Sequence, residues 1–222
     1  MNCLSTHKPV TVIIFAKAPE PGFAKTRLIP ALGEEGAAEL AKQLLNKAVD
    51  QAITTRLDVI ELCVTPDQHD PFWLGVINET AKLGVTLALT QQTNGNLGER
   101  MSAAAKRHID QGRAVLLMGT DCPPLTTERL LAAASVLQDH DAAMYPVEDG
   151  GYSLLGLNQW DPSLFIEIPW STDVVADMTI QRLATLGWSC WQGDRLWDLD
   201  EPADLSRLTP DFQIDTFLRS PS

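Results

Sequence analysis

Four short apolar runs in the first 118 residues constrain the fold of this chain more than any other feature. They span residues 10–16, 59–64, 85–89 and 115–118, and helical patterns follow most of them. Short apolar runs without strict alternation are typical of strands that are buried on both faces of a sheet. The alternation of such strands with helices predicts βαβ units, and therefore a mostly parallel sheet with helices on both faces.

The second half changes this rhythm. Residues 142–147 and 152–157 are expected to form two strands joined by a tight acidic turn. No repeat, low-complexity segment or linker interrupts the chain, so we expect residues 1–222 to form one domain. The remaining predicted elements are a helix over 173–186, a short strand over 188–192 and a last helical turn over 203–208.

Composition and charge narrow the function. The 222 residues carry a formal net charge of -12, and a protein this acidic is not expected to bind nucleic acid. No apolar run approaches the ~18 residues of a membrane span, and the N-terminus lacks the pattern of a signal peptide. We therefore expect a cytoplasmic protein with no membrane partner. The four cysteines are scattered without metal-ligand spacing.

The segment from Val12 to Leu28 is the first candidate site. Its apolar start breaks into a loop that contains two prolines and Gly22, followed by a helical pattern from about Glu34. Three basic residues stand in and just after the loop: Lys17, Lys25 and Arg27. The order of strand, cationic loop and helix is typical of phosphate binding in α/β proteins. The alternative is a solvated surface loop.

Asp121 is the strongest single candidate for chemistry. It follows the buried run 115–118, at the end of a strand where α/β folds bind ligands. Its carboxylate could hold magnesium or manganese, which prefer oxygen ligands and share them with phosphates. Alternatively, the side chain accepts hydrogen bonds from loop amides.

Two further acidic groups are candidates. Asp198 and Asp200 stand two residues apart, and we expect only one of them to reach a given metal; a helix N-cap is the alternative role. The second group, residues 148–151, combines two carboxylates with two glycines that would let a ligand approach the backbone. A plain hairpin turn explains that group equally well.

Six motifs follow one another along the chain. They are FAKAPEPGFAKTRL (15–28), NLGERM (96–101), GTDCP (119–123), EDGGYSLLGL (148–157), WSTD (170–173) and DLDEPADL (198–205). In this series the chain resembles a glycosyltransferase-A-like family of the nucleotide-diphospho-sugar transferase superfamily, and the match covers nearly the whole chain in the family's order.

This resemblance implies a three-layer α/β/α sandwich with a mixed, mainly parallel sheet. Its N-terminal half would bind the nucleotide and its C-terminal half the acceptor. Asp121 and Asp200 would be the metal ligands, with Asp198 as the second choice for the latter. The nucleotide would contact Ala16, Lys17, Gly22, Lys25, Arg27, Asn96, Leu97, Gly98 and Arg100, and the sugar or acceptor would contact Glu148, Asp149, Gly150, Gly151, Tyr152 and Trp170.

The implied activity is transfer from a nucleotide-activated donor, with magnesium or manganese as cofactor. A metal held by Asp121 and Asp200 would stabilise the leaving phosphates together with Lys25 and Arg27, and Asp149 or Glu148 would be the base. Glycosyl transfer from a nucleotide sugar to a small acceptor is the first hypothesis.

One departure from the family's motifs supports an alternative to glycosyl transfer. Many glycosyltransferases of this fold carry Asp-x-Asp at the mid-chain site, whereas Cys122 and Pro123 follow Asp121 here. That sequence and the basic first loop are closer to nucleotidyltransferases, which join a nucleoside triphosphate to a phosphorylated metabolite and release pyrophosphate. A nucleotide-binding domain without turnover is the third hypothesis.

Overall fold

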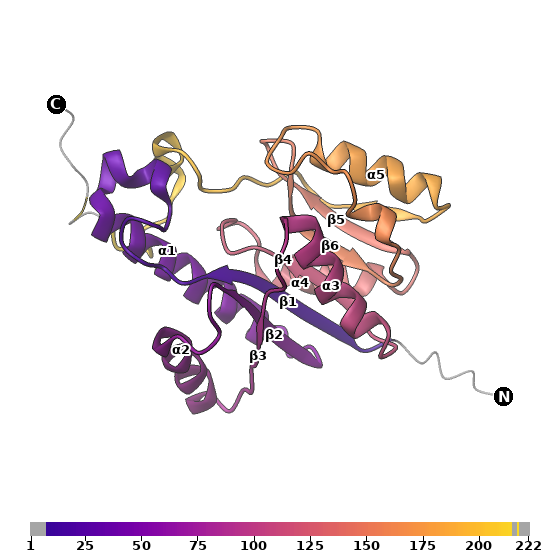
Figure 1. Ribbon diagram of the computed structural model, residues 1–222, viewed down its shortest axis with the longest axis horizontal. Helices are drawn as coiled ribbons and strands as arrows, with labels where there is room; N and C mark the ends of the chain where they lie inside the picture. The colour runs from indigo at the N-terminus through magenta and orange to yellow at the C-terminus, as the bar shows by residue number, and fades with distance from the viewer. Residues whose placement is uncertain (1–7, 215–216, 218–222) are drawn as a thin grey trace.

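The computed structural model describes residues 8–214 and 217, which are built around one seven-stranded sheet (Figure 1). The strand order is β3-β2-β1-β4-β6-β5-β7. The strands are β1 (Val10–Lys17), β2 (Val59–Thr65), β3 (Ala88–Gln91), β4 (Ala114–Met118), β5 (Ala142–Pro146), β6 (Tyr152–Leu157) and β7 (Cys190–Gln192). The α-helices are α1 (Ile29–Thr54), α2 (Pro71–Lys82), α3 (Leu97–Ile109), α4 (Thr127–Val136) and α5 (Val175–Thr185). Three short 3-10 helices are η1 (Thr26–Leu28), η2 (Pro162–Leu164) and η3 (Pro202–Arg207).

Strand direction confirms the predicted sheet. Strands β1, β2, β3 and β4 pair in parallel, and β7 pairs in parallel with β5. Strand β6 runs antiparallel to both of its neighbours, β4 and β5. The sheet is therefore mixed and mainly parallel, and the carboxyl ends of β1, β2 and β4 share one edge.

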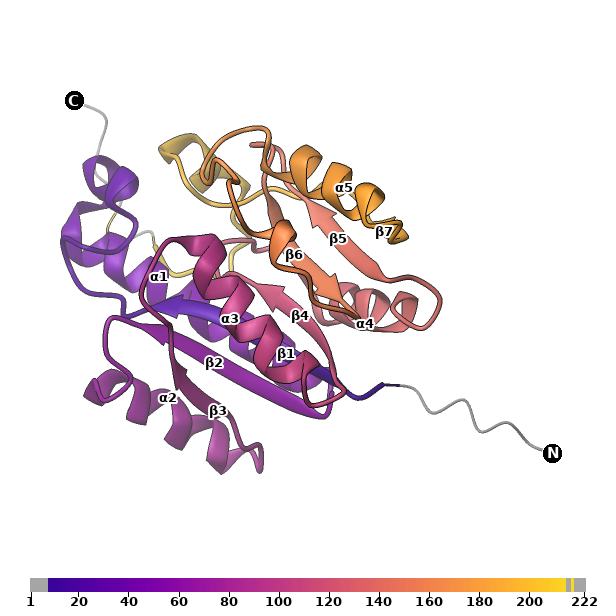
Figure 2. The same ribbon diagram turned by 45° about the vertical axis from the view of Figure 1, so that its right-hand side comes forward.

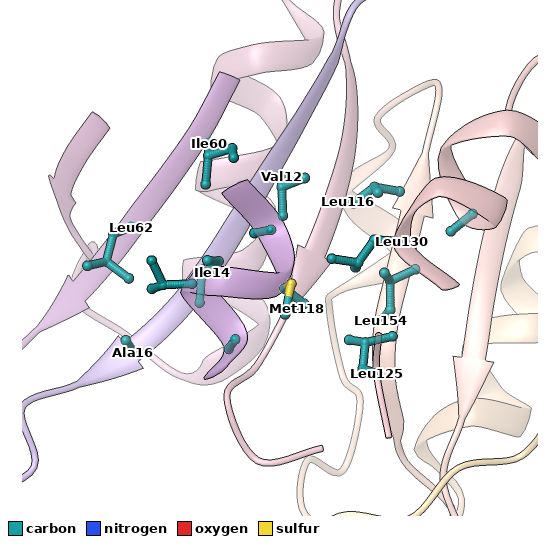
Figure 3. Close-up of a cluster of buried hydrophobic side chains, with 14 of the residues drawn as sticks. Val12, Ile14, Ala16, Ile60, Leu62, Leu116, Met118, Leu125, Leu130 and Leu154 are labelled. Carbon is teal, nitrogen blue, oxygen red and sulfur yellow. The ribbon is translucent and has the colours of Figure 1, made fainter. Parts of the chain in front are cut away.

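Helices cover both faces of the sheet, as the alternating pattern predicts. Side chains of α1, α2 and α4 pack on one face in a cluster that includes Val12, Ile14, Leu116 and Leu130 (Figure 3). Helices α3 and α5 pack on the other face, and Figure 2 shows α3 lying across β1 and β4. Burial of apolar surface on both faces is the main favourable term that holds the three layers together.

A third apolar cluster fastens the C-terminal segment to α1. Leu28, Leu40 and Leu44 pack with Leu199 and Phe212, which lie far away in sequence. In Figure 1 the yellow C-terminal segment accordingly lies beside the first turns of α1. This packing brings the predicted Asp198–Asp200 motif to the same edge of the sheet as the loop after β1.

A buried ionic network fixes α3 on the sheet. Glu61 of β2 is 1% exposed and contacts Arg107, His108 and Thr90, with its Oε2 atom 2.6 Å from His108 Nε2. Burial by itself raises the pKa of Glu61, but the hydrogen bonds and positive partners outweigh it, so the pKa is lowered. The Glu61 carboxylate therefore stays ionised beneath α3.

The sequence prediction missed one helix. In the sequence, Asp70 and Pro71 suggest a break and residues 72–74 only a short apolar patch, whereas α2 begins at Pro71. Asp70 and Pro71 start a helix instead, because the Asp70 side chain accepts a hydrogen bond from Phe72 N and proline fits the first helical turn. Helix α1 also begins five residues before the expected Glu34, with a kink at Gly33, where φ is 75°. Within the described residues, no helix is long and apolar enough to cross a membrane.

Candidate active site at the carboxyl edge of the sheet

Three loops and the C-terminal segment meet at the carboxyl edge of the central strands. Leu199 N donates to Asp121 O at 2.8 Å, which joins the C-terminal segment to the loop after β4. Glu148 N donates to Leu196 O at 3.0 Å, which joins the same segment to the β5–β6 turn. The backbone therefore gathers four aspartates from distant parts of the sequence: Asp121, Asp149, Asp198 and Asp200.

The Lys25 ammonium lies between two of these aspartates. Its Nζ atom is 2.9 Å from Asp121 Oδ1 and 3.1 Å from Asp200 Oδ1, and it also donates to Leu199 O. An ammonium group has three N–H donors, so these three acceptors occupy all of them. Burial alone would lower the pKa of Lys25, but Asp121 and Asp200 raise it, so the charge is kept. Lys25 thus joins the loop after β1 to the aspartates at the carboxyl edge of the sheet.

Arg27 differs from Lys25 in exposure. Its side chain is 66% exposed, and its Nη1 atom lies 3.4 Å from Glu201 Oε1 and 3.9 Å from Asp200 Oδ2. An exposed, flexible pair of this kind contributes little stability, so the guanidinium is free to move toward a ligand.

Asp200 also belongs, with Asp149 and Asp198, to a group of possible metal ligands. One carboxylate oxygen each from Asp149, Asp198 and Asp200 lies within 4.8 Å of the others. The expectation that only one of Asp198 and Asp200 reaches a given site is wrong. Alternate residues of an extended segment point to the same side, and Leu199 between them is fully buried against α1.

Burial and the proximity of like charges shift the pKa of Asp198. Burial and the neighbouring charges of Asp149, Asp200 and Asp121 together raise its pKa to about 6. Oxygen ligands are what magnesium and manganese prefer, and a divalent cation would relieve this repulsion. The three carboxylates therefore fit the metal that the fold family implies, and Lys25 contacts one of them, Asp200, as well as Asp121.

The β5–β6 turn orients Asp149 through its backbone. Asp149 Oδ1 accepts a hydrogen bond from Gly151 N at 2.9 Å. Gly150 has a φ of +88°, and a Cβ atom there would lie 2.0 Å from Asp173 O. Only glycine fits this close approach, and Gly150 O in turn accepts from Ala176 N in α5. The turn is thus fixed by the segment that begins α5.

Glu148 takes part in a different contact. Its two carboxylate oxygens accept from Arg207 Nη1 and Nη2 at 2.7 and 2.9 Å. The hydrogen bonds from Arg207 lower the pKa of Glu148, which makes it a weaker base than an unpaired carboxylate. Arg207 was not singled out in the sequence, because nothing in its local pattern indicates a partner at residue 148.

The NLGERM motif (96–101) caps and begins α3. Asn96 caps α3 by accepting from Glu99 N at 3.0 Å, and the Glu99 carboxylate accepts in turn from Asn96 N at 2.7 Å. Arg100 donates to Gly95 O at 2.9 Å and to Gln92 Oε1 at 3.3 Å. Gln92 also donates to Ala16 O, so it connects Arg100 to the end of β1. Sequence reasoning missed Gln92, whose role depends on contacts with β1 and β2.

A cavity of about 230 Å³ adjoins the acidic group, between α3 and α5. We call it the α3–α5 cavity. Gly98 allows its wall to form, because a Cβ atom there would lie 2.7 Å from the Trp170 ring and 2.4 Å from Phe165 O. The cavity is lined by Phe15, Leu97, Met101, Leu117, Met118, Gly119, Val147, Asp149, Gly151, Tyr152, Ser153, Trp170, Ser171, Thr172, Val175 and Asp198.

The sheet order and the position of the acidic edge define an α/β protein with the nucleotide-diphospho-sugar transferase fold. A candidate nucleotide-diphospho-sugar transferase from Desulfovibrio desulfuricans superposes with a TM-score of 0.79 at 30% identity, over 96% of this chain and 91% of that one. A family model matches residues 48–172, and the chain belongs to this family, described as uncharacterized protein conserved in bacteria (DUF2064). A comparison with curated proteins finds no match.

More distant structures share the fold alone. A 4-diphosphocytidyl-2C-methyl-D-erythritol synthase from Anaerococcus prevotii gives a TM-score of 0.59 at 12% identity, over 93% of this chain and 97% of that one. A candidate glucose-1-phosphate thymidylyltransferase from Bacillus anthracis gives 0.55 at 12% identity, over 89% and 93%.

Proposed function

We propose that this protein is a metal-dependent transferase that acts on a nucleotide-activated donor and transfers a glycosyl group to a small acceptor. The observation that carries the proposal is the convergence of three carboxylates beside a ligand-sized cavity at the carboxyl edge of the sheet. The similarity to a candidate nucleotide-diphospho-sugar transferase at 30% identity supports the same class of reaction.

The donor nucleotide would lie along the edge between the end of β1 and the start of α3. Residues of this segment include Ala16, Gly22 and the capped NLGERM motif. Arg100 is held by two neutral oxygens, and Lys17 donates to Phe23 O at 3.1 Å. Because their described partners carry no charge, both residues keep their positive charge available for phosphates.

Asp198 and Asp200 would hold magnesium or manganese, and Asp149 would lie next to the metal. When bound, the metal would neutralise charge on the leaving diphosphate. Lys25 would keep Asp121 and Asp200 oriented, and a phosphate that recruits Lys25 must compete with those two carboxylates. Arg27, which is 66% exposed and lies farther from its carboxylate partners, can approach the phosphates at a lower cost than Lys25.

The acceptor would bind on the side of Tyr152 and Trp170. Its hydroxyl oxygen forms the new bond to the anomeric carbon, and the bond from that carbon to the diphosphate oxygen breaks. The hydroxyl proton passes to a carboxylate, for which Asp149 is the candidate. Glu148 is less suited to this role, because Arg207 holds both of its oxygens.

Nucleotidyl transfer is the second candidate. The specific observation in its favour is the number of cations near the nucleotide segment, Lys17, Arg27 and Arg100, which suits a triphosphate donor. In that reaction a substrate phosphate oxygen attacks the α-phosphorus and pyrophosphate leaves. No base is needed, because the attacking phosphate is already ionised.

The two reactions release different products, and this decides between them. Purified protein is incubated with nucleoside triphosphates or nucleotide sugars, with magnesium or manganese. Thermal shift identifies which donor binds. Release of nucleoside diphosphate would support glycosyl transfer, and release of pyrophosphate would support the alternative. Tight nucleotide binding without consumption of any donor, across a broad panel of acceptors, would indicate a non-catalytic domain.

A further inference from the structure

The side chain of Gln92 reaches across two strands of the sheet. Gln92 N donates to Val64 O at 2.8 Å, which extends the pairing of β3 with β2 by one residue. From there its Nε2 atom donates to Cys63 O of β2 at 2.9 Å and to Ala16 O of β1 at 3.3 Å. The amide is therefore held near the carboxyl ends of β1 and β2, at the edge of the sheet where α/β folds bind ligands.

These contacts fix the direction in which the amide points. A side-chain amide has two N–H donors and one carbonyl acceptor, and two backbone carbonyls accept both donors of Gln92. The reversed amide would place its oxygen against two carbonyl oxygens. Gln92 Oε1 therefore faces Arg100, whose Nη1 atom donates to it at 3.3 Å.

The guanidinium of Arg100 is held at two of its donors and free at the others. Its Nε atom donates to Gly95 O at 2.9 Å and its Nη1 atom to Gln92 Oε1. Arginine has five N–H donors, so three of them, including both on Nη2, have no acceptor among the described residues. Gly95 has a φ of +115°, a conformation that favours glycine. A fixed guanidinium with free donors is suited to bind the oxygens of a phosphate.

The partners of Arg100 carry no charge, which distinguishes it from other basic residues at this edge. Lys25 and Arg27 contact carboxylates, and Arg207 pairs with Glu148. A phosphate that binds one of those residues must compete with a carboxylate. Within the part of the chain that the structure describes, no carboxylate competes for Arg100, which bonds only to neutral oxygens.

From these observations we infer that Gln92 is a positioning residue, whose amide holds Arg100 so that the free guanidinium donors bind a phosphate of the donor. Gln92 itself touches no phosphate. The inference rests on the proposed function for one point only, that the phosphate belongs to a nucleotide. The alternative role for Gln92 is to hold β3 against β1 and β2 without any effect on Arg100.

A double-mutant cycle separates these two roles. Gln92→Met, Arg100→Met and the double variant are compared with wild type by calorimetric titration of inorganic pyrophosphate in the presence of magnesium. Arg100→Met should weaken pyrophosphate binding by about tenfold to a hundredfold, because it removes charge-assisted hydrogen bonds. Gln92→Met should weaken it by about three- to tenfold, because an arginine without its anchor must be ordered on binding. In the Arg100→Met background, Gln92→Met should change the affinity by no more than about twofold.

Two further variants test the charge and the location. In Gln92→Glu, a carboxylate would pair with Arg100, so pyrophosphate binding should weaken by about tenfold or more. Gln91→Met is the matched control, because Gln91 bonds to Gln68 N and Pro66 O and has no contact with Arg100; its affinity should equal that of wild type. Thermal unfolding verifies that each variant folds. If Gln92→Met does not fold, Gln92→Glu replaces it in the cycle, and its effect should again shrink when Arg100 is absent.

Three results would overturn the inference: unchanged affinity in Gln92→Met, unchanged affinity in Arg100→Met, or an equal loss from Gln92→Met with and without Arg100. The same samples are titrated with ADP, CDP, GDP and UDP. If wild type binds pyrophosphate but none of these nucleotides, the proposed function is refuted and the positioning role of Gln92 stands. If wild type binds neither, both are refuted.

Discussion

Replacement of Asp198 by asparagine should make the metal-free protein more stable, although it removes a residue of the candidate metal site. The folded protein raises the pKa of Asp198 from 3.8 to about 6 by burial and by the nearby carboxylates. At ~1.36 kcal/mol per pKa unit, that difference corresponds to about 3 kcal/mol of destabilisation once the group is ionised. Asparagine removes the charge and keeps the shape, so we expect a gain of roughly 1–3 kcal/mol at pH 8.

The dependence on pH identifies the cause. Because the folded-state pKa of Asp198 is higher than the unfolded one, the folded state binds more protons between about pH 4 and 6. The penalty is therefore nearly absent at pH 4, grows as the pH rises through that window and is complete above about pH 7. The advantage of Asp198→Asn over wild type should grow in the same way.

The assay is urea unfolding with a chelator present, at pH 4, 5, 6 and 8, for wild type, Asp198→Asn and Asp139→Asn. Asp139 is exposed and outside the site, so its variant should stay within about 0.5 kcal/mol of wild type at every pH. The reasoning is refuted if Asp198→Asn is no more stable than wild type at pH 8, or if its advantage does not decline toward pH 4.

Three further predictions address the other contacts. Lys25→Met should destabilise the metal-free protein by roughly 1–2 kcal/mol, because it leaves two half-exposed carboxylates facing each other. Manganese should then raise the Tm of this variant more than the Tm of wild type. An equal rise in both proteins would contradict the prediction. Gly150→Ala should cost about 2–4 kcal/mol in urea unfolding because of the overlap with Asp173 O, whereas Gly84→Ala, with a similar φ and open space, should cost only about 1 kcal/mol. Glu61→Gln should lose about 3 kcal/mol by breaking the buried network under α3, and unchanged stability would show that the network contributes nothing net.

Much of the fold could be predicted from the chain alone, for a physical reason. Strands buried on both faces need unbroken apolar runs, and the runs that became β1, β2 and β4 stand out in the sequence. The reversal at β6 was indicated by the short acidic turn before it. Helix α2 was missed because Asp70 and Pro71 act as breakers in one context and as helix starters in another.

The candidate site divides differently between sequence and structure. The sequence by itself determined which residue types are available: basic residues after β1 and aspartates at four separate positions. Only the tertiary structure decided their partners, because those depend on backbone pairing between distant segments. The hydrogen bond from Leu199 N to Asp121 O holds the C-terminal segment beside the loop after β4. Lys25 therefore lies between Asp121 and Asp200, and Asp198 and Asp200 lie near Asp149. No local pattern carries that information.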